Sequence, residues 1–200
     1  IEELGDVLFQ VIFHAAIGKE DGYYNLSDII EGICNKMIYR HPHVFGNADV
    51  NTTEEVLANW DELKKKEKHF NTMTDELNGV AKALPALIRA AKVQKKAKKV
   101  GFDFENVDKT LEKIKEEINE LEEVYKTDNV DRITEELGDL LFSCVNTARF
   151  LNVDSEEALN KCINKFIERF SYIENTAISL GLNLKEMSLK EMDELWEKTK

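Results

Sequence analysis

Residues 116–120 read Glu-Glu-Ile-Asn-Glu, and residues 135–142 read Glu-Glu-Leu-Gly-Asp-Leu-Leu-Phe. Each stretch carries two acidic residues three positions apart, a spacing that places both side chains on one face of a helix. These residues are Glu117 and Glu120 in the first stretch and Glu136 and Asp139 in the second. The spacing therefore predicts two helices, each with a pair of carboxylates on one face.

The turn between the two stretches places the carboxylate pairs opposite each other in an antiparallel hairpin. Counted from residue 128 at its tip, Glu120 and Glu136 are each eight positions away, and Glu117 and Asp139 are each eleven. Four carboxylates then converge on one point, where only a cation can offset their mutual repulsion. Oxygen ligands alone suit Mg²⁺, with Mn²⁺ as a possible substitute, and do not suit zinc.

Apolar residues follow the same helical spacing, and the carboxylates border the faces that these residues are expected to bury. A single Glu-x-x-Glu pair in so acidic a chain is usually part of a solvated face, but two facing pairs favour a metal site. The apolar residues are Leu111, Ile114, Ile118, Leu121 and Val124 in the first helix, and Ile133, Leu137, Leu140, Leu141, Cys144, Val145 and Ala148 in the second.

The composition indicates an all-α globular protein. Of the 200 residues, 42% are hydrophobic, 33% are charged and only two are proline, and the abundance of Leu, Ile, Lys, Glu and Ala favours helices. The formal net charge of −12 argues against nucleic acid or a membrane surface as partner, because both are anionic. A polyanionic substrate would have to be accompanied by metal.

Three cysteines, Cys34, Cys144 and Cys162, lie in apolar helical stretches without Cys-x-x-Cys spacing. We expect buried free thiols and hence the reducing environment of the cytoplasm. The sequence shows neither an apolar stretch of membrane-spanning length nor a leader peptide. It begins at Ile1 in the middle of a motif, so we expect a fragment of a longer protein.

The chain contains an internal repeat. Residues 2–9 differ from residues 135–142 only in having Val where the second stretch has Leu. Two further matches follow in the same order, and we therefore expect two copies of one helical domain. They pair Asn35-Lys36 and Arg40 with Asn164-Lys165 and Arg169, and Trp60 and Lys64 with Trp196 and Lys200.

The repeat predicts an incomplete first domain at residues 1–67, a connector at 68–83 and a complete second domain at 84–200. The first domain lacks the counterpart of the first acidic helix, so half of its metal ligands are missing. Short loops between periodic apolar stretches predict that the second domain is a bundle of four main helices with a short fifth one. They are expected at about 85–100, 107–126, 131–151, 155–180 and 188–199.

The two acidic motifs resemble those of the all-α nucleoside triphosphate pyrophosphohydrolase superfamily. Within it the chain is most similar to the tandem-domain MazG family, and the resemblance covers essentially all 200 residues. Three more stretches carry the resemblance: Arg-His-Pro-His-Val-Phe at 40–45, Leu-Pro-Ala-Leu at 84–87 and Val-Gly-Phe-Asp at 100–103.

The resemblance implies hydrolysis of nucleoside triphosphates to the monophosphate and pyrophosphate, as nucleotide-pool housekeeping. It implies a homodimer whose active site can include residues of both chains. Mg²⁺ ligands and catalytic carboxylates are implied at Glu117, Glu120, Glu136 and Asp139. Nucleotide contacts are implied at Lys113, Arg132, Lys165, Arg169, Trp196 and Lys200. The residues do not decide whether Glu116 or Glu135 accepts a proton from the attacking water.

Other interpretations stay open. Lys165 and Arg169 share a helix face that can clamp phosphates, but they can equally form surface ion pairs. Trp196 can stack on a base or pack in the core. The chain can also be a non-catalytic nucleotide-binding or regulatory module, or a pyrophosphohydrolase restricted to dUTP or a phosphoribosyl nucleotide. The preferred base and sugar do not follow from the sequence.

Overall fold

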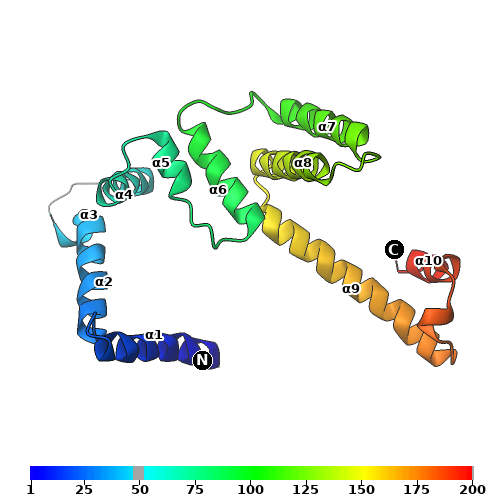
Figure 1. The fold of residues 1–200 in the computed structure, drawn as a ribbon, viewed down its shortest axis with the longest axis horizontal. Helices are drawn as coiled ribbons and strands as arrows, with labels where there is room; N and C mark the ends of the chain where they lie inside the picture. Colours follow the sequence, from blue (N-terminus) through cyan, green and yellow to red (C-terminus); the bar gives the residue numbers. More distant parts are fainter. Residues whose placement is uncertain (47–51, 200) are drawn as a thin grey trace. The chain divides into compact units, whose positions relative to one another are not determined.

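The computed structural model describes residues 1–46 and 52–199, and the regular structure within these residues is entirely helical (Figure 1). The predicted all-α class is therefore confirmed. The helices belong to two units, Ile1–Thr72 and Met73–Lys200. In the described part of the chain, no helix combines the length and the apolar character needed to cross a membrane.

The first unit contains α1 (Glu2–Glu20), α2 (Leu26–Arg40), α3 (Pro42–Phe45) and α4 (Thr53–Glu67). α2 packs against both α1 and α4. Asn25 caps α2, because its side chain accepts a hydrogen bond from the Ser27 N–H at 2.8 Å while the Asp28 carboxylate accepts one from the Asn25 N–H. α2 ends before Pro42, which cannot donate a backbone hydrogen bond and instead begins α3.

The second unit contains α5 (Met73–Asn78), α6 (Ala86–Lys98), α7 (Val107–Val124), α8 (Val130–Phe150), α9 (Ser155–Ser179), the 3₁₀ helix η1 (Leu184–Glu186) and α10 (Leu189–Glu197). From α6 to α10 the helices lie close to their predicted bounds. α5 lies within the segment predicted as a connector and packs against α6. Its Glu76 is 5% exposed and forms an ion pair with Lys96 at 3.3 Å.

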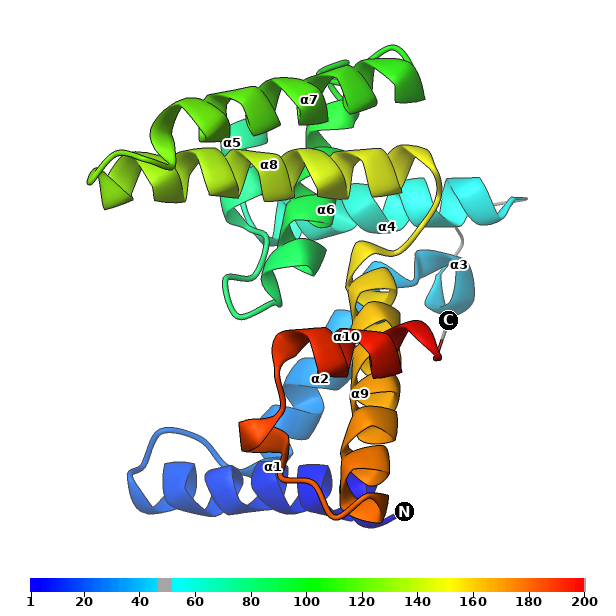
Figure 2. The same cartoon turned by 90° about the vertical axis from the view of Figure 1, so that its right-hand side faces the viewer.

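α7 and α8 form an antiparallel hairpin and lie side by side along their length (Figure 2). Asn106 caps α7 by accepting a hydrogen bond from the Lys109 N–H, and Asn129 caps α8 by accepting one from the Arg132 N–H. Val124, at the end of α7, is 1% exposed and anchors the hairpin beside its turn. The hairpin therefore has the register on which the predicted carboxylate site depends.

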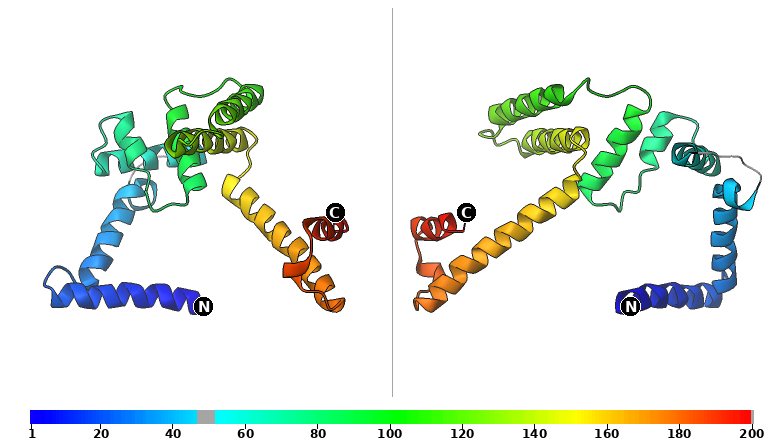
Figure 3. Two further views of the ribbon diagram at one scale, coloured as in Figure 1. Left: turned by 45° about the vertical axis from the view of Figure 1, so that its right-hand side comes forward. Right: turned by 180° about the vertical axis from the view of Figure 1, so that it is seen from behind.

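The remaining helices of the second unit form two packed groups, one where α6 meets α8 and the other where α10 meets α9. α6 packs across α8 and also contacts α9, while the chain turns back after α9 so that α10 packs against it (Figure 3). Val145 of α8 is buried in the first group, and Ile173 and Ala177 of α9 are buried in the second. α7, α8 and α6 thus surround one space, while α9 and α10 form a separate pair.

The prediction of buried cysteines is wrong. All three thiols are free, as predicted, but Cys34, Cys144 and Cys162 are exposed. Part of the predicted apolar stripes is exposed as well, including Leu137 at 45% and Leu141 at 52%. Periodicity identifies the apolar face of a helix but not the element that covers it, and few contacts join α9 to α8.

Candidate metal and nucleotide site

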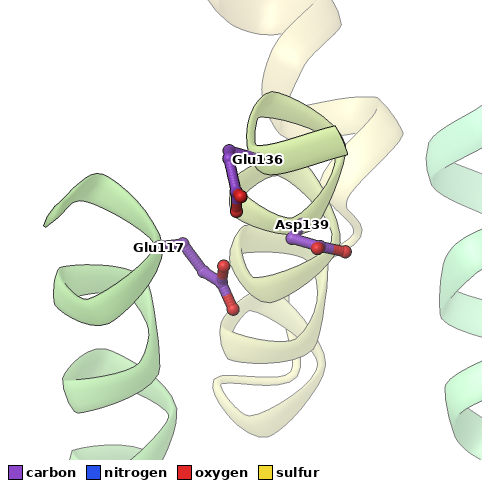
Figure 4. Close-up of side chains that lie close together, drawn as sticks. All are labelled: Glu117, Glu136 and Asp139. Carbon is purple, nitrogen blue, oxygen red and sulfur yellow. The ribbon is translucent and has the colours of Figure 1, made fainter. Parts of the chain in front are cut away.

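Three carboxylates meet between α7 and α8. Glu117 comes from α7, and Glu136 and Asp139 come from α8, each offering one oxygen so that the three lie within 4.8 Å of one another. Figure 4 shows the Glu117 side chain reaching from its helix toward the other two. Glu117 is 2% exposed, Glu136 is half-buried and Asp139 is exposed, so the group opens to solvent on one side. This arrangement can hold a metal ion.

Glu117 presents an oxygen that the protein itself does not satisfy. Its Oε1 lies 2.7 Å from Lys113 Nζ, whereas its Oε2 is buried and has no hydrogen-bond partner among the described residues. Burying a carboxylate oxygen without a partner is costly. The orphaned oxygen and the all-oxygen donor set therefore fit a hard divalent cation such as Mg²⁺ or Mn²⁺.

Glu120, the fourth predicted ligand, does not belong to this group of three. It lies one turn after Glu117 on α7 and is half-buried. Partial burial and the nearby Glu117 and Glu136 carboxylates raise the pKa of Glu120. The Glu120 carboxylate therefore lies close to the other carboxylates. In this conformation, however, it contributes no oxygen to the cluster of Glu117, Glu136 and Asp139.

Two of the predicted nucleotide contacts, Lys113 and Arg132, lie at the carboxylate group. Lys113 Nζ is 2.8 Å from Glu116 and 2.7 Å from Glu117, and these hydrogen bonds raise the pKa of Lys113. Arg132 lies at 3.8 Å from Glu136 and is more exposed. Both cations can therefore turn from the carboxylates toward an anionic ligand. Glu116 is held by Lys113, and Glu135 is exposed.

Three of the other predicted contacts, Lys165, Arg169 and Trp196, lie on α9 and α10. The Arg169 guanidinium lies over the Trp196 ring, 5.4 Å from its centroid, and the Phe166 ring is 5.3 Å from the same centroid. Lys165 is exposed on the same helix. Lys200 lies outside the described residues. The structure thus brings Arg169 and Trp196 together, but it does not bring them to the carboxylates within one chain.

The first unit contains the counterpart of this pair. The Arg40 guanidinium lies 5.5 Å from the centroid of the Trp60 ring, and Lys64 lies over the same ring at 4.7 Å. The repeat seen in the sequence therefore recurs as a spatial contact. In the first unit, however, Arg40 also forms an ion pair with Glu67 at 2.6 Å.

A cavity of about 670 Å³ opens beside the carboxylates, between α6, the loop that follows it, α7 and α8. The volume lies in the range of small-molecule sites. Glu117, Asp139 and Lys113 line one part of it, and the rest is lined mainly by polar and aromatic side chains that the sequence reasoning missed. These include Gln94, Phe102, Asp103, Phe104, Phe142, Ser143, Asn146 and Arg149.

Part of this cavity had a signal in the sequence. Ser143 and Asn146 follow Asp139 at helical spacing and interrupt the apolar face of α8, and both are 8% exposed. A polar residue on a face expected to be buried indicates a hydrogen-bonding role. Gln94 carried no comparable signal, because α6 is rich in polar residues all along its length.

Comparison with known families finds one match. A model described as the MazG nucleotide pyrophosphohydrolase domain matches residues 1–45 and 105–173, one stretch in each unit. The second stretch contains all four predicted carboxylates and all of α7 and α8.

Relatives match almost the whole chain. The nucleoside triphosphate pyrophosphohydrolase/pyrophosphatase MazG of Thermotoga maritima is 42% identical over 199 residues, which cover 100% of this chain and 75% of the relative. The nucleoside triphosphate pyrophosphohydrolase of Escherichia coli is 39% identical over 200 residues, covering 99% and 76%. The uncharacterized protein YabN of Bacillus subtilis is 50% identical over 201 residues, covering 100% and 41%. The similarity therefore extends well beyond the acidic motifs.

Proposed function

Because this chain belongs to the MazG nucleotide pyrophosphohydrolase family, we propose that it hydrolyses nucleoside triphosphates, as its relatives' names state. The reaction cleaves the bridge between the α and β phosphates with one water molecule, giving the monophosphate and pyrophosphate. The observation that carries the proposal is the buried Glu117 carboxylate, which faces Glu136 and Asp139 and has an oxygen to which none of the described residues donates a hydrogen bond. Ribo- and deoxyribonucleotides are both candidate substrates.

We assign Mg²⁺ as the metal, with Mn²⁺ as a substitute, and Glu117, Glu120, Glu136 and Asp139 as its ligands. When bound, the ion neutralises phosphate oxygens and lowers the pKa of a water molecule. Glu120 would join the three gathered carboxylates by a change of its side-chain rotamer, since it already lies near Glu117 and Glu136. Glu116 and Glu135 adjoin the ligands and are the candidates to accept the proton of the attacking water.

Lys113 and Arg132 are proposed to bind the phosphates. Each is now paired with a carboxylate of the group, at 2.7 Å from Glu117 and 3.8 Å from Glu136. Neutralisation of these carboxylates by a cation would release both side chains to attract phosphate oxygens. The ion pairs thus keep two positive charges beside the reaction centre.

Lys165, Arg169 and Lys200 are proposed to bind the nucleotide from the second chain of a homodimer, and Trp196 is proposed to contribute by holding Arg169 in place. This follows from the place of Lys165, Arg169 and Trp196 on α9 and α10, away from the cavity beside the carboxylates. Exposed apolar residues on α9 support a partner surface: Leu159, Ile163, Phe166, Ile167 and Phe170 are 40% to 56% exposed. Arg169 covers one face of the Trp196 ring, which favours Trp196 as a support for this guanidinium rather than as a base platform.

Each unit is proposed to represent one copy of the domain, with catalysis in residues 84–200 and a role in packing or dimerisation for residues 1–67. The two stretches matched by the family model support this division. A cytoplasmic location is proposed as well, because the three cysteines are free thiols.

The direct test is product analysis by anion exchange after incubation with a panel of ribo- and deoxyribonucleoside triphosphates, including dUTP, and with a phosphoribosyl nucleotide. We expect monophosphate and pyrophosphate with Mg²⁺ and neither product in EDTA. Nucleotide binding without turnover would instead indicate the non-catalytic module. Turnover of dUTP or a phosphoribosyl nucleotide alone would indicate the narrower enzyme.

A further inference from the structure

The antiparallel hairpin of α7 and α8 (Figure 2) is joined by a short turn at one end and by an ion pair at the other. Counted from residue 128 at the turn, Arg149 lies 21 positions later, and Val107, the first residue of α7, lies 21 positions earlier. Arg149 pairs with Asp103, which comes four residues before Val107. The ion pair therefore joins the two helices at the open end of the hairpin, the end that has no turn.

The proposed metal ligands lie midway between these two ends. Glu117 and Asp139 are each eleven positions from residue 128, and they are ten positions from Val107 and Arg149, respectively. Ten residues of helix rise about 15 Å, at roughly 1.5 Å per residue. If the open end spreads while the turn stays fixed, the carboxylates therefore separate by about half as much. A metal site tolerates a displacement of its ligands of only about 0.5 Å, so a small movement at the open end weakens it.

The ion pair at the open end is well defined. Arg149 Nη1 donates a hydrogen bond to Asp103 Oδ2 at 3.1 Å, and Arg149 Nη2 donates one to Asp103 Oδ1. The same guanidinium donates to Asn146 Oδ1, at 3.1 Å from Nε and 2.6 Å from Nη2. The side chains of Arg149 and Asp103 are only 15% and 14% exposed. A partly buried pair with two parallel hydrogen bonds holds its geometry better than a single exposed ion pair.

Asp103 is itself tied to the start of α7. Its Oδ1 accepts a hydrogen bond from the Phe104 N–H at 3.0 Å, and Asn106, three residues after Asp103, caps α7. On the other side, Gly101 ends the turn after α6 with a φ of +84°, a conformation that favours glycine. A displacement of Asp103 is therefore transmitted to α7 through a short, hydrogen-bonded segment.

The open end depends on this ion pair because little else among the described residues holds it. Of the described helices, α7 packs chiefly against α8, and the cavity of about 670 Å³ lies on the side where α6 approaches the hairpin. Asp103 and Arg149 line this cavity, as do Glu117 and Asp139. Without a cation the carboxylates repel one another and push the two helices apart. The ion pair opposes that repulsion.

We propose that the ion pair of Arg149 and Asp103 is a clamp that sets the spacing of α7 and α8 at the carboxylates and thereby raises the affinity of the site for a divalent cation. The clamp rests on the proposed metal site but not on the hydrolysis of any nucleotide. Arg149 and Asp103 are positioning residues, which act through the helices that carry Glu117 and Asp139. The carboxylates are then already arranged when the cation arrives, so binding does not have to supply the free energy of arranging them.

The test is a titration with Mn²⁺, followed by electron paramagnetic resonance of the free ion, at a temperature at which circular dichroism shows every variant to be folded. Glu117→Gln identifies the relevant site in this acidic chain, because its tight binding should be lost. Arg149→Gln and Asp103→Asn should each weaken binding roughly threefold to tenfold, less than the roughly tenfold to 100-fold loss for residues that hold a metal ligand directly. The double variant should bind like either single variant, since each substitution already opens the clamp.

The direction of the two effects separates a clamp from a direct effect of charge. Asp103→Asn removes a negative charge and Arg149→Gln removes a positive one, so charge alone would weaken Mn²⁺ binding in the first variant and tighten it in the second. A clamp weakens binding in both. Arg149→Lys keeps the charge but cannot form the two parallel hydrogen bonds, so it should also weaken binding. It replaces Arg149→Gln if that variant does not fold.

Glu76→Gln is the matched control for lost stability. Glu76 is buried and pairs with Lys96 at 3.3 Å, which joins α5 to α6 rather than α7 to α8. Its substitution removes an ion pair of the same kind but should leave the Mn²⁺ affinity unchanged. A folded fraction of about 90% lowers the apparent affinity by only about a tenth, so lost stability does not account for a threefold change.

Mn²⁺ affinities that stay unchanged in Arg149→Gln and Asp103→Asn, shift in opposite directions or add up in the double variant would overturn the clamp. Tight binding that is absent from the wild type, or that survives in Glu117→Gln, would overturn it as well. Turnover of a nucleoside triphosphate by the wild type with Mg²⁺ reports on the proposed function alone. Weakened Mn²⁺ binding in both variants without wild-type turnover would support the clamp and contradict the enzyme. Wild-type turnover with Mn²⁺ affinities that do not respond to the substitutions would do the reverse.

Discussion

Arg169 lies over the ring of Trp196 at 5.4 Å from its centroid, as Arg40 lies over Trp60 at 5.5 Å in the first unit. The two pairs differ in their surroundings. Arg40 forms an ion pair with Glu67, whereas the described residues provide no acidic partner for Arg169. A guanidinium that is held by a ring and carries an uncompensated charge is suited to bind an external anion.

The first prediction concerns these two arginines. Arg169→Ala should lower kcat/KM for a nucleoside triphosphate about tenfold to 100-fold, because a hydrogen bond to a charged group contributes about 1.5–3 kcal/mol. Steady-state kinetics measures the effect. Arg40→Ala is the matched control and should leave the kinetics close to wild type, so equal losses in the two variants would contradict a specific role of Arg169.

The second prediction concerns Glu120. Glu120→Gln keeps the shape of the side chain but removes a proposed metal ligand, so activity should fall by about 100-fold or more. Circular dichroism should show an unchanged helical fold. Glu123→Gln, at an exposed position on the same helix, serves as the control. Full activity of Glu120→Gln at the wild-type Mg²⁺ requirement would remove Glu120 from the site.

The third prediction concerns the pairing of Lys113 with buried Glu117. Lys113→Met should lower stability in EDTA by about 1 kcal/mol, a value reduced by the partial exposure of Lys113, because it leaves a buried carboxylate without its partner. Mg²⁺ should narrow the difference, since the cation replaces the lost positive charge. Thermal unfolding with and without Mg²⁺ measures both effects.

Lys109→Met is the control for Lys113. Lys109 pairs with Glu112 at 2.6 Å on the same helix, but both side chains are at least half exposed. Its loss should change the melting temperature little, with or without Mg²⁺. A Lys113→Met variant that behaves in the same way would show that Glu117 does not depend on this lysine.

The fourth prediction is a dependence of stability on pH. The hydrogen bond with Arg149 holds the pKa of Asp103 below its usual range. A lowered folded-state pKa means that the pair stabilises the protein above the unfolded-state pKa of about 4 and loses this contribution as pH falls through the folded-state value. Asp103→Asn should therefore reduce the melting temperature at pH 7 and make less difference near pH 3.

Asp193→Asn, at an exposed position on α10, is the control for this series. Melting temperatures of the wild type and both variants between pH 7 and pH 3 provide the comparison. A gap between wild type and Asp103→Asn that stays constant or widens toward acid would contradict the pairing of Asp103 with Arg149.

The fifth prediction concerns the exposed apolar face of α9. Ile163→Asp should convert a homodimer into a monomer, because burying a carboxylate in an apolar interface is costly. Light scattering coupled to size exclusion measures the mass. Asn160→Asp, also exposed on α9, should leave the mass unchanged. A wild-type chain that is monomeric at all concentrations would contradict the dimer itself.

Local patterns were sufficient to predict the helices α6 to α10 of the second unit, although not α5. The acidic pairs, the asparagine caps and the short turn all act within a few residues of one another, and helix geometry converts their spacing into position. The same reasoning placed Glu117, Glu136 and Asp139 around one point. It also placed Glu120 there, where the structure leaves it beside the group rather than in it.

Local patterns did not predict the burial or the contacts of a side chain where these depended on residues far away in the sequence. The cysteines lie on apolar helix faces, yet they are exposed, because none of the described helices covers them. Gln94 looked like any polar residue of α6, and its hydrogen bond emerged only where α6 crosses α8 and Phe142 offers its carbonyl. Burial is decided by what packs against a face, and a single helix does not contain that information.

The sequence by itself therefore determined the helical class, the register of the α7 and α8 hairpin and the carboxylates that face each other across it. Each of these follows from spacing along one or two adjacent helices. Only the tertiary structure decided which oxygen of Glu117 lacks a partner within the described part of the chain, that Arg149 pairs with Asp103, and that a cavity lies beside them. Those properties arise from contacts between segments far apart in the chain, whose geometry is set by packing rather than by spacing.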